Sequence, residues 1–333
     1  MHRVKAKKLT SQYKKIVSYF LKAGIVFFAF WFVYSKLTAN KNLKDFKNLL
    51  TQIPQWEIFC VLGFVLFLML VNWGLEAVKW KRLISSVERI SLWKSVASVF
   101  CGLTWAVFTP NRIGEYGGRV FFLSPKRRVI GVVAMAVGNI GQMVLTNVFG
   151  AIAFCVFIYR FVNIDPLLFY GLVFLALIFC LFFIVFYFNI KWLNGILLSM
   201  RFTRKYKKFY NILARYQKRE LFKILLLCFS RYLVFSTQYF ILFFWLIPNL
   251  HYLEILMMVS ILFFVQSTLP SLDLFDIGVR TATASYFFSS ITDQEVAVIA
   301  CTASIWLINI IIPAILGTYF VFKLNFFGNL QRS

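Results

Sequence analysis

The sequence is poor in acidic residues, histidine and proline. It has 12 Asp and Glu against 36 Lys and Arg, with two His and seven Pro in 333 residues. The histidines, His2 and His251, lie far apart and have no ligand-like neighbours. Nucleotide-binding loops, dinucleotide fingerprints, HExxH and GxSxG are absent. The sequence therefore excludes coupling to bound ATP and indicates no catalytic residue, no metal site and no cofactor, so we do not expect an enzyme.

Cysteine is also scarce. The six cysteines lie singly in apolar runs without CxxC spacing, which argues against a disulfide framework or a zinc site. They are Cys60, Cys101, Cys155, Cys180, Cys228 and Cys301. We interpret them as packing residues.

Long apolar runs are abundant. Apolar residues make up 61% and charged residues 14% of the chain, and several runs approach the ~20 residues that cross a bilayer. About six long transmembrane helices are predicted, at residues 16–35, 56–75, 130–159, 167–188, 221–246 and 296–322. The first follows a basic leader without a small-residue cleavage site, which is typical of a retained anchor. The predicted fold class is an all-α polytopic membrane protein.

Two further apolar segments are interrupted by proline, glycine and charge. The first joins an arm at 95–108 to TPNRIGEYGGR (109–119) and a short arm at 120–123, and the second joins 253–269 to STLPSLDLFDIGVR (267–280). Proline stops a helix, and the polar backbone freed at membrane depth must lie in protein or face a watery cavity. We expect two broken helical hairpins, re-entrant or short and paired, in the inverted arrangement of transporters with a site at the midplane.

Two basic segments have apolar stripes. Residues 76–94 and 200–221 carry apolar residues at helical spacing beside Lys and Arg, so both are predicted to lie on the membrane surface. Asn72 and Glu76 would then close the second span, either as a helix-end cap or as functional residues.

The distribution of basic residues predicts the topology. Most lysines and arginines fall in alternate connections, which the positive-inside rule places in the cytoplasm together with both termini. The net charge of +24 then reflects topology and anionic lipid, and no nucleic acid is expected. We expect a basic N-terminus at 1–15, one transmembrane domain at 16–323 with inverted halves of roughly 56–188 and 221–322, and a tail at 324–333.

The first break carries the main candidate site for a lipid head group. Arg112 and Arg119 can grip a phosphate, and Glu115 can accept a cationic group. The alternative is an internal salt-bridged plug that shapes the broken helix. Gly114 would permit close approach of the backbone to a head group, or simply tight helix packing.

A second set of candidate residues lies in the later half. Asp273, Asp276 and Arg280 flank the second break, and Arg231 lies inside the fifth span. Charge within a membrane costs ~2.5–3.5 kcal/mol per residue, so the first three either pair with one another or contact substrate or the first motif. Arg231 either snorkels to the cytoplasmic side or belongs to the site.

These stretches resemble the membrane region of the lysylphosphatidylglycerol synthases, a flippase-like family. The resemblance covers roughly residues 15–323 and is strongest in the series Pro110, Arg112, Gly114, Glu115 and Arg119. Trp73 with LEAVKWKRLI and the later LPSLDLFDIGVR add to it. The resemblance implies a protein of the bacterial inner (plasma) membrane that moves aminoacylated phospholipid between leaflets.

The sequence also departs from this family. Members often carry charged residues where this chain has Gly141, Gln142, Asn147 and Thr281, which leaves the identity of the lipid open. Full-length members add a soluble aminoacyl-transferase domain, whereas here only a short tail follows residue 322. We therefore do not expect lipid synthesis on this chain.

The expected function is binding and translocation of a phospholipid or other lipid head group. The expected partners are anionic or aminoacylated phospholipids within the membrane, with a homodimer or a separate soluble synthase left open. The alternative is a membrane enzyme or accessory scaffold in lipid-linked sugar or phosphate transfer.

Overall fold

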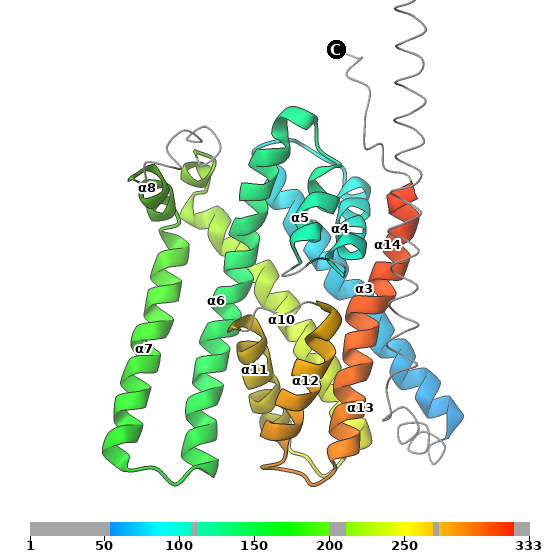
Figure 1. The fold of residues 1–333 in the computed structure, drawn as a ribbon, viewed down its shortest axis with the longest axis vertical. Coiled ribbons are helices and arrows are strands. Elements are labelled where there is room, and N and C mark those ends of the chain that lie inside the picture. The colour runs from blue at the N-terminus through cyan, green and yellow to red at the C-terminus, as the bar shows by residue number, and fades with distance from the viewer. Residues whose placement is uncertain (1–53, 108, 110–111, 200–210, 269–272, 323–333) are drawn as a thin grey trace, which may run out of the picture.

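The computed structural model describes residues 54–107, 109, 112–199, 211–268 and 273–322. These residues form helices and turns, and none of them lies in a β-strand. Five helical stretches are long and apolar enough to cross a membrane (Figure 1): Gln55–Ile84, Pro125–Phe161, Pro166–Phe188, Lys218–Leu246 and Glu295–Phe322. This confirms the all-α class and five of the predicted spans. The predicted first span, 16–35, lies outside the described residues.

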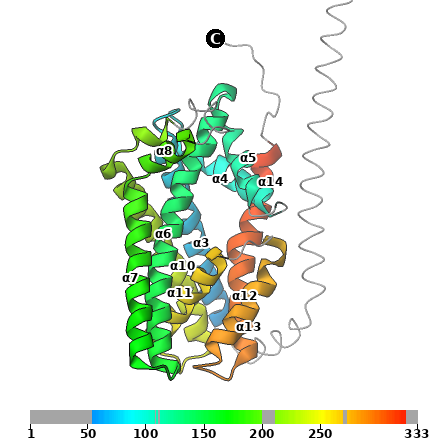
Figure 2. The same ribbon diagram turned by 60° about the vertical axis from the view of Figure 1, so that its left-hand side comes forward.

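The outermost long helix shows how the bundle meets its surroundings. α7 (Pro166–Phe188) follows α6 (Arg128–Phe161) at one edge of the bundle (Figures 1 and 2). In the most apolar part of α7, no residue is buried against protein, and the mean hydropathy is 2.9. Apolar side chains exposed in this way are stable in lipid and not in water, as in an integral membrane protein.

The second predicted span is longer than expected. α3 runs without a break from Gln55 to Ile84, and Trp80 and Leu83 are fully buried. The prediction that residues 76–84 lie on the membrane surface is therefore wrong, because the apolar stripe of this segment faces α6 and α10 (Lys218–Leu246). Asn72 and Glu76 accordingly lie inside a helix and do not cap its end.

The second predicted surface helix is wrong in part. Residues 200–210 lie outside the described range, but after α8 (Lys191–Ser199) and the single turn η3 (Leu213–Arg215) the chain packs into the core. Leu213 and Tyr216 are buried, and the Tyr216 hydroxyl donates to the Leu83 carbonyl at 2.8 Å. The described end of this apolar stripe, Leu213 and Tyr216, therefore covers protein instead of lipid.

Two pairs of short helices lie between the long ones, as the sequence predicts. α4 (Leu92–Ala106) is followed by α5 (Ile113–Val120), and α11 (Tyr252–Thr268) by α12 (Asp273–Phe288). The arm after the first break is the motif itself, Ile113–Val120, and not the predicted 120–123. In both views the α4–α5 pair lies in the upper half of the molecule and the α11–α12 pair in the lower half (Figures 1 and 2).

The last span contains an irregular turn. α13 (Glu295–Trp306) continues through the π-helical turn η4 (Leu307–Ile311) into α14 (Ile312–Phe322). Pro313 lacks an amide hydrogen, so the usual helical bond to Asn309 cannot form, and a wider turn absorbs the defect. The long predicted span at 296–322 is thus confirmed as one irregular helix.

Glycines bring α4 against both α5 and α14. A Cβ on Gly118 would lie 2.5 Å from the Gly102 Cα atom, and one on Gly317 would lie 2.1 Å from the Phe100 carbonyl oxygen. The Thr104 hydroxyl also donates to the Ala314 carbonyl at 2.8 Å. Helices in membranes gain contact in this way because small residues let their backbones approach. The position of α5 therefore depends on α14 through α4.

Glu88 links the turn before α4 to the turn after α5. Its carboxylate accepts bonds from the Ser124 amide at 3.1 Å and the Ser124 hydroxyl at 2.8 Å, and Lys94 lies 3.6 Å away. Partial burial raises the pKa of this carboxyl, but the bonds from Ser124 and the nearby Lys94 and Arg127 outweigh it and hold the pKa below the ordinary 4.5. The ionised carboxylate thus contributes stability above pH 4.5, which is lost as the pH falls through the depressed pKa.

We expect Glu88→Gln to lower stability by less than about 1 kcal/mol at pH 7, because the pair is partly screened by solvent. The difference in melting temperature between parent and variant should shrink below pH 4.5, where the parent loses the same contribution. Thermal unfolding followed by tryptophan fluorescence from pH 7 to pH 3 measures this. A difference that stays constant over the whole range would contradict the assignment.

Candidate functional site

Glu76 lies at the centre of a buried ionic network. Arg119 Nη1 donates to Glu76 Oε1 at 2.6 Å, and Lys79 Nζ lies 2.7 Å from Glu76 Oε2. Arg231 Nη1 donates to the same Oε2 atom. The side chains of Glu76, Lys79 and Arg119 are 2–3% exposed, and that of Arg231 is 15% exposed. One carboxylate therefore joins α3, α5 and α10 through three cations.

Glu115 extends this network along α5. It accepts a bond from Arg119 Nη2 and a second from Arg112 Nε at 3.0 Å. Arg119 thus lies between the two carboxylates of Glu76 and Glu115. On the other side of Glu76, Arg231 Nε donates to Asn72 Oδ1 at 3.0 Å. We call these seven residues the Glu76 network: Asn72, Glu76, Lys79, Arg112, Glu115, Arg119 and Arg231.

Positive charge exceeds negative charge in the Glu76 network. Around Glu76 and Glu115, the described side chains of Lys79, Arg119 and Arg231 bring three cations to two carboxylates, an excess of one positive charge. Burying charge that is not compensated costs several kcal/mol per ion. In addition, the Arg119 Nε atom is buried with no hydrogen-bond partner. Among these described side chains, the network is thus short of acceptors and of negative charge.

The local sequence explains how α5 presents its charged face. The Thr109 hydroxyl accepts the Gly114 amide at 2.7 Å, and a Cβ on Gly114 would lie 2.3 Å from the Trp105 carbonyl oxygen. Close contact with α4 holds the first turn of α5 in place. Glu115 and Arg119 then lie four residues apart on one helix face, where their side chains can pair.

Arg112 has a strained backbone at the start of α5. Its φ of 56° is in the left-handed region, which glycine adopts freely and a long side chain does not. Such a residue costs of order 1–3 kcal/mol and persists where surrounding structure or function requires it. Here it places the Arg112 guanidinium on Glu115.

The structure brings together four of the predicted site residues. Arg112, Glu115, Arg119 and Arg231 all belong to the Glu76 network. The internal ion pairs of the alternative interpretation are therefore present, and the head-group role stays a prediction. Snorkelling of Arg231 is wrong, because its guanidinium binds Glu76 and Asn72 inside the bundle and lies 5.2 Å from the Trp73 ring.

The other predicted site residues are placed as follows. Gly114 packs against α4, as its alternative interpretation states. Arg280 lies half-buried on α12, and the described contacts of the Glu76 network do not include it. The side chains of Asp273 and Asp276 lie outside the described part of the structure. Their role stays a prediction.

Sequence reasoning missed Lys79 and treated Asn72 and Glu76 as the end of a span. One signal was available, since positions 72, 76 and 79 are spaced by four and three residues and so share one helix face. That face also carries Met69 and the buried Trp80. A polar row on the buried side of a continuous helix predicts a buried ionic site.

The positions where the sequence departs from the flippase-like family are polar or small contacts in the structure. Asn147 Oδ1 on α6 accepts a bond from the Ser267 hydroxyl on α11 at 2.9 Å. A Cβ on Gly141 would lie 3.1 Å from the Tyr187 hydroxyl oxygen.

Within the described ranges, no group of three or more His, Cys, Asp or Glu side chains could hold a metal ion.

Comparison with known proteins gives no relative: no family model, curated protein or solved structure matches this chain. The resemblance to the lysylphosphatidylglycerol synthases therefore stays a prediction. Any function must be argued from the Glu76 network and the helices that carry it.

Proposed function

We propose that this protein binds the phosphate-bearing head group of a membrane lipid at the Glu76 network and moves it between leaflets. The observation that carries the proposal is the buried Nε atom of Arg119, which has no hydrogen-bond partner, beside the three cations Lys79, Arg119 and Arg231 that share the Glu76 carboxylate. A phosphate has the negative charge and the acceptor oxygens that this network is short of. Arginine binds phosphate through two parallel hydrogen bonds, which makes it suited to such a group.

The strain at Arg112 supports the same role. A left-handed backbone carrying a long charged side chain is expensive, and a simple turn between α4 and α5 would be better served by glycine. The Arg112 side chain is 31% exposed, so it is the member of the network most accessible from outside the cluster. We infer that Arg112 is the first residue to meet an arriving head group.

The arrangement of the broken helices supports translocation over static binding. The α4–α5 and α11–α12 pairs lie in opposite halves of the molecule (Figures 1 and 2). We propose that they form an inverted pair, as in transporters whose sites lie near the midplane between discontinuous helices. Movement between inward- and outward-open states then requires a lipid that binds the two states with different affinity.

We propose that the upper end in Figure 1 faces the cytoplasm of a bacterium, with the protein in the inner membrane. The turns at this end carry the basic residues Lys126, Arg127 and Arg128 between α5 and α6, and Lys218 and Arg219 at the start of α10. At the opposite end the described turns carry no Lys or Arg beyond Arg160 of α6. The positive-inside rule favours this orientation.

Arg112→Gly separates the proposed role from folding. Glycine accepts a φ of 56° without strain, so the variant should keep the fold while losing one phosphate contact. We expect the rate at which fluorescent phosphatidylglycerol crosses the membrane of reconstituted liposomes to fall about tenfold, the loss of one charge-assisted bond. The rate is measured by chemical quenching of the outer leaflet.

The matched control is Arg82→Gln, which removes an arginine that is 36% exposed and pairs with Glu220 outside the network. It should move lipid at the parental rate. Glu115→Ala should behave like Arg112→Gly, because Arg112 and Arg119 both depend on that carboxylate for position. Parental rates in both network variants would rule out the proposed role.

A further inference from the structure

A cavity lies at the other end of the bundle, between the end of α12 and the start of α13. Its volume is about 370 Å³, within the roughly 300–1,000 Å³ of small-ligand sites. The cavity is lined by four hydroxyl residues, Ser285, Tyr286, Ser289 and Thr292, by the carboxyl residues Asp293 and Glu295, and by Val298. All of these residues lie in the described ranges, far along the chain from the Glu76 network.

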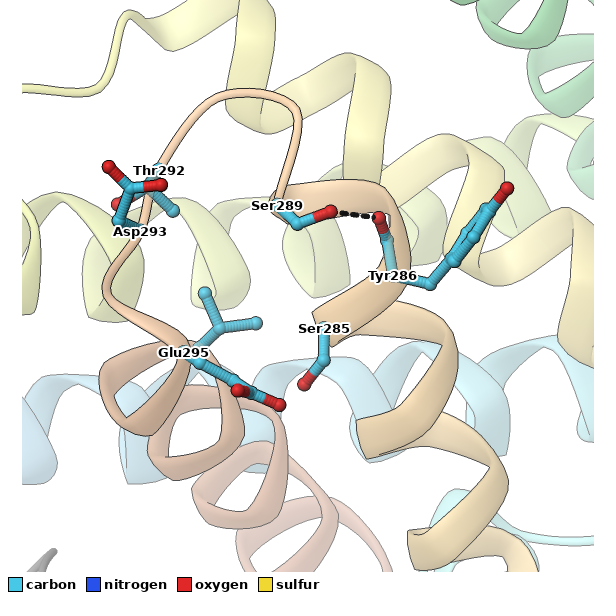
Figure 3. Close-up of a pocket in the computed structure, with 7 residues that line it drawn as sticks. Ser285, Tyr286, Ser289, Thr292, Asp293 and Glu295 are labelled. Atoms are coloured by element: carbon cyan, nitrogen blue, oxygen red, sulfur yellow. Dashed lines mark hydrogen bonds between the residues drawn. The ribbon is translucent and has the colours of Figure 1, made fainter.

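The lining combines polar and acidic groups with apolar surface (Figure 3). The figure shows the Ser285 hydroxyl and the Glu295 carboxylate on the same side of the space, and the Ser289 hydroxyl turned back to donate to the Tyr286 carbonyl at 2.7 Å. The Ser285 oxygen is buried with no hydrogen-bond partner. A buried hydroxyl without a partner is costly, so this one calls for a ligand group or water.

The two carboxylates have no counter-ion within the described chain. Neither Asp293 nor Glu295 takes part in an ion pair there, whereas the basic residue Arg160 at the end of α6 is held by Glu254 at 2.7 Å. Glu295 in the first turn of α13 is also favourable for the helix dipole. That role explains one carboxylate, but it explains neither the cavity nor the unpartnered hydroxyl.

We propose that this cavity is a binding site for an ammonium group. An ammonium has three hydrogen-bond donors and one positive charge, which match the Ser285 hydroxyl and the two carboxylate oxygens of Glu295, while Asp293 adds negative charge at the other side of the space (Figure 3). The end of α12 adds the negative end of its dipole. This site is separate from the Glu76 network, and the inference holds whether or not the protein moves lipid.

The ammonium can come from a lipid head group or from a free amine in solution. The test uses purified full-length protein in detergent and native mass spectrometry. Short-chain phosphatidylethanolamine is compared with its N-acetylated form, which keeps the phosphate and loses the ammonium. Because the Glu76 network is the same in the parent and in a variant of the cavity, a difference between the two proteins in the ratio of these affinities reports on the cavity and not on the phosphate site.

We expect the parent to bind phosphatidylethanolamine about tenfold more tightly than the N-acetylated lipid, a difference typical of a charge-assisted contact. The double variant Asp293→Asn with Glu295→Gln should lose this preference. Asp165→Asn is the matched control, since it removes a carboxylate at the same end and an Asn can still cap α7 through the Leu167 amide. Ser285→Ala provides a second test and should weaken the preference about threefold.

Competition decides the source of the ammonium. If free ethanolamine displaces phosphatidylethanolamine, the site binds a soluble amine. If the protein prefers phosphatidylethanolamine and free ethanolamine does not displace it, the site binds a lipid head group. Equal preference in parent and double variant would overturn the proposal. So would occupancy by calcium ion alone with no preference between the two lipids.

Discussion

Glu76→Gln is expected to lower the free energy of unfolding by about 3–5 kcal/mol, the cost of leaving buried ions without their partner. Lys79, Arg119 and Arg231 all bind this carboxylate, and the neutral amide cannot balance their charge. The expected result is a large drop in melting temperature of the detergent-solubilised protein, measured by tryptophan fluorescence at a fixed lipid concentration.

Two variants make this result interpretable. Glu57→Gln alters a partly exposed carboxylate in the first turn of the same helix and should melt close to the parent. Glu76→Gln combined with Lys79→Met removes one of the stranded cations and should recover part of the loss. The free energies of unfolding of Glu76→Gln and Glu57→Gln are then compared. A difference of less than about 1 kcal/mol would show that the network is not a buried ionic centre, because ion pairs on the surface contribute no more than that.

Gly317→Ala is expected to destabilise the protein by about 1–3 kcal/mol or more, the usual cost of adding a methyl group to a packed core. The new Cβ would lie 2.1 Å from the Phe100 carbonyl oxygen and 2.3 Å from the Thr104 hydroxyl oxygen. Since backbone cannot turn away as a side chain can, α14 must move away from α4. Melting temperature measures the loss of stability.

Gly63→Ala is the matched control for this substitution. Gly63 lies on the exposed side of α3, and a Cβ there would meet no atom within 4 Å. Because alanine favours helix over glycine by about 1 kcal/mol, the control should be neutral or slightly more stable. Equal melting temperatures for Gly317→Ala and Gly63→Ala would show that α4 and α14 are not closely packed.

The long spans could be predicted because their signal is local. A run of apolar residues of bilayer length fixes α6, α7 and α10 to within three residues at either end. The separation of α4 from α5 and of α11 from α12 was predicted for the same reason, as proline and glycine act on their own backbone. The π-helical turn at Leu307–Ile311 was not predicted, because its form depends on packing around Pro313.

The continuation of α3 could not be predicted from its own residues. The apolar stripe of Trp80, Leu83 and Ile84 fits a surface helix and a packed helix equally well, and only contact with α6 and α10 decides between them. The same limit applies to Leu213 and Tyr216. An amphipathic pattern indicates that one face of a helix is covered, but it does not indicate whether lipid or protein covers that face.

Only part of the candidate site could be predicted from the sequence. Arg112, Glu115 and Arg119 were identified because charge within apolar sequence is costly and needs a reason. The bonds from Arg119 and Arg231 to Glu76 were not predicted, since these residues lie 43 and 155 positions from Glu76 in the sequence. A partner at that separation follows from the way α3, α5 and α10 pack, which no local pattern encodes.

The measurement that tests the phosphate site most directly is lipid retention by native mass spectrometry. Phosphatidylglycerol is titrated against diacylglycerol with the same chains, on the parent, Arg231→Gln and the control Arg82→Gln. We expect the parent and the control to bind one phosphatidylglycerol in clear preference to diacylglycerol, and Arg231→Gln to bind it about tenfold more weakly. Equal binding of the two lipids by the parent, or unchanged binding by Arg231→Gln, would contradict a phosphate site at the Glu76 network.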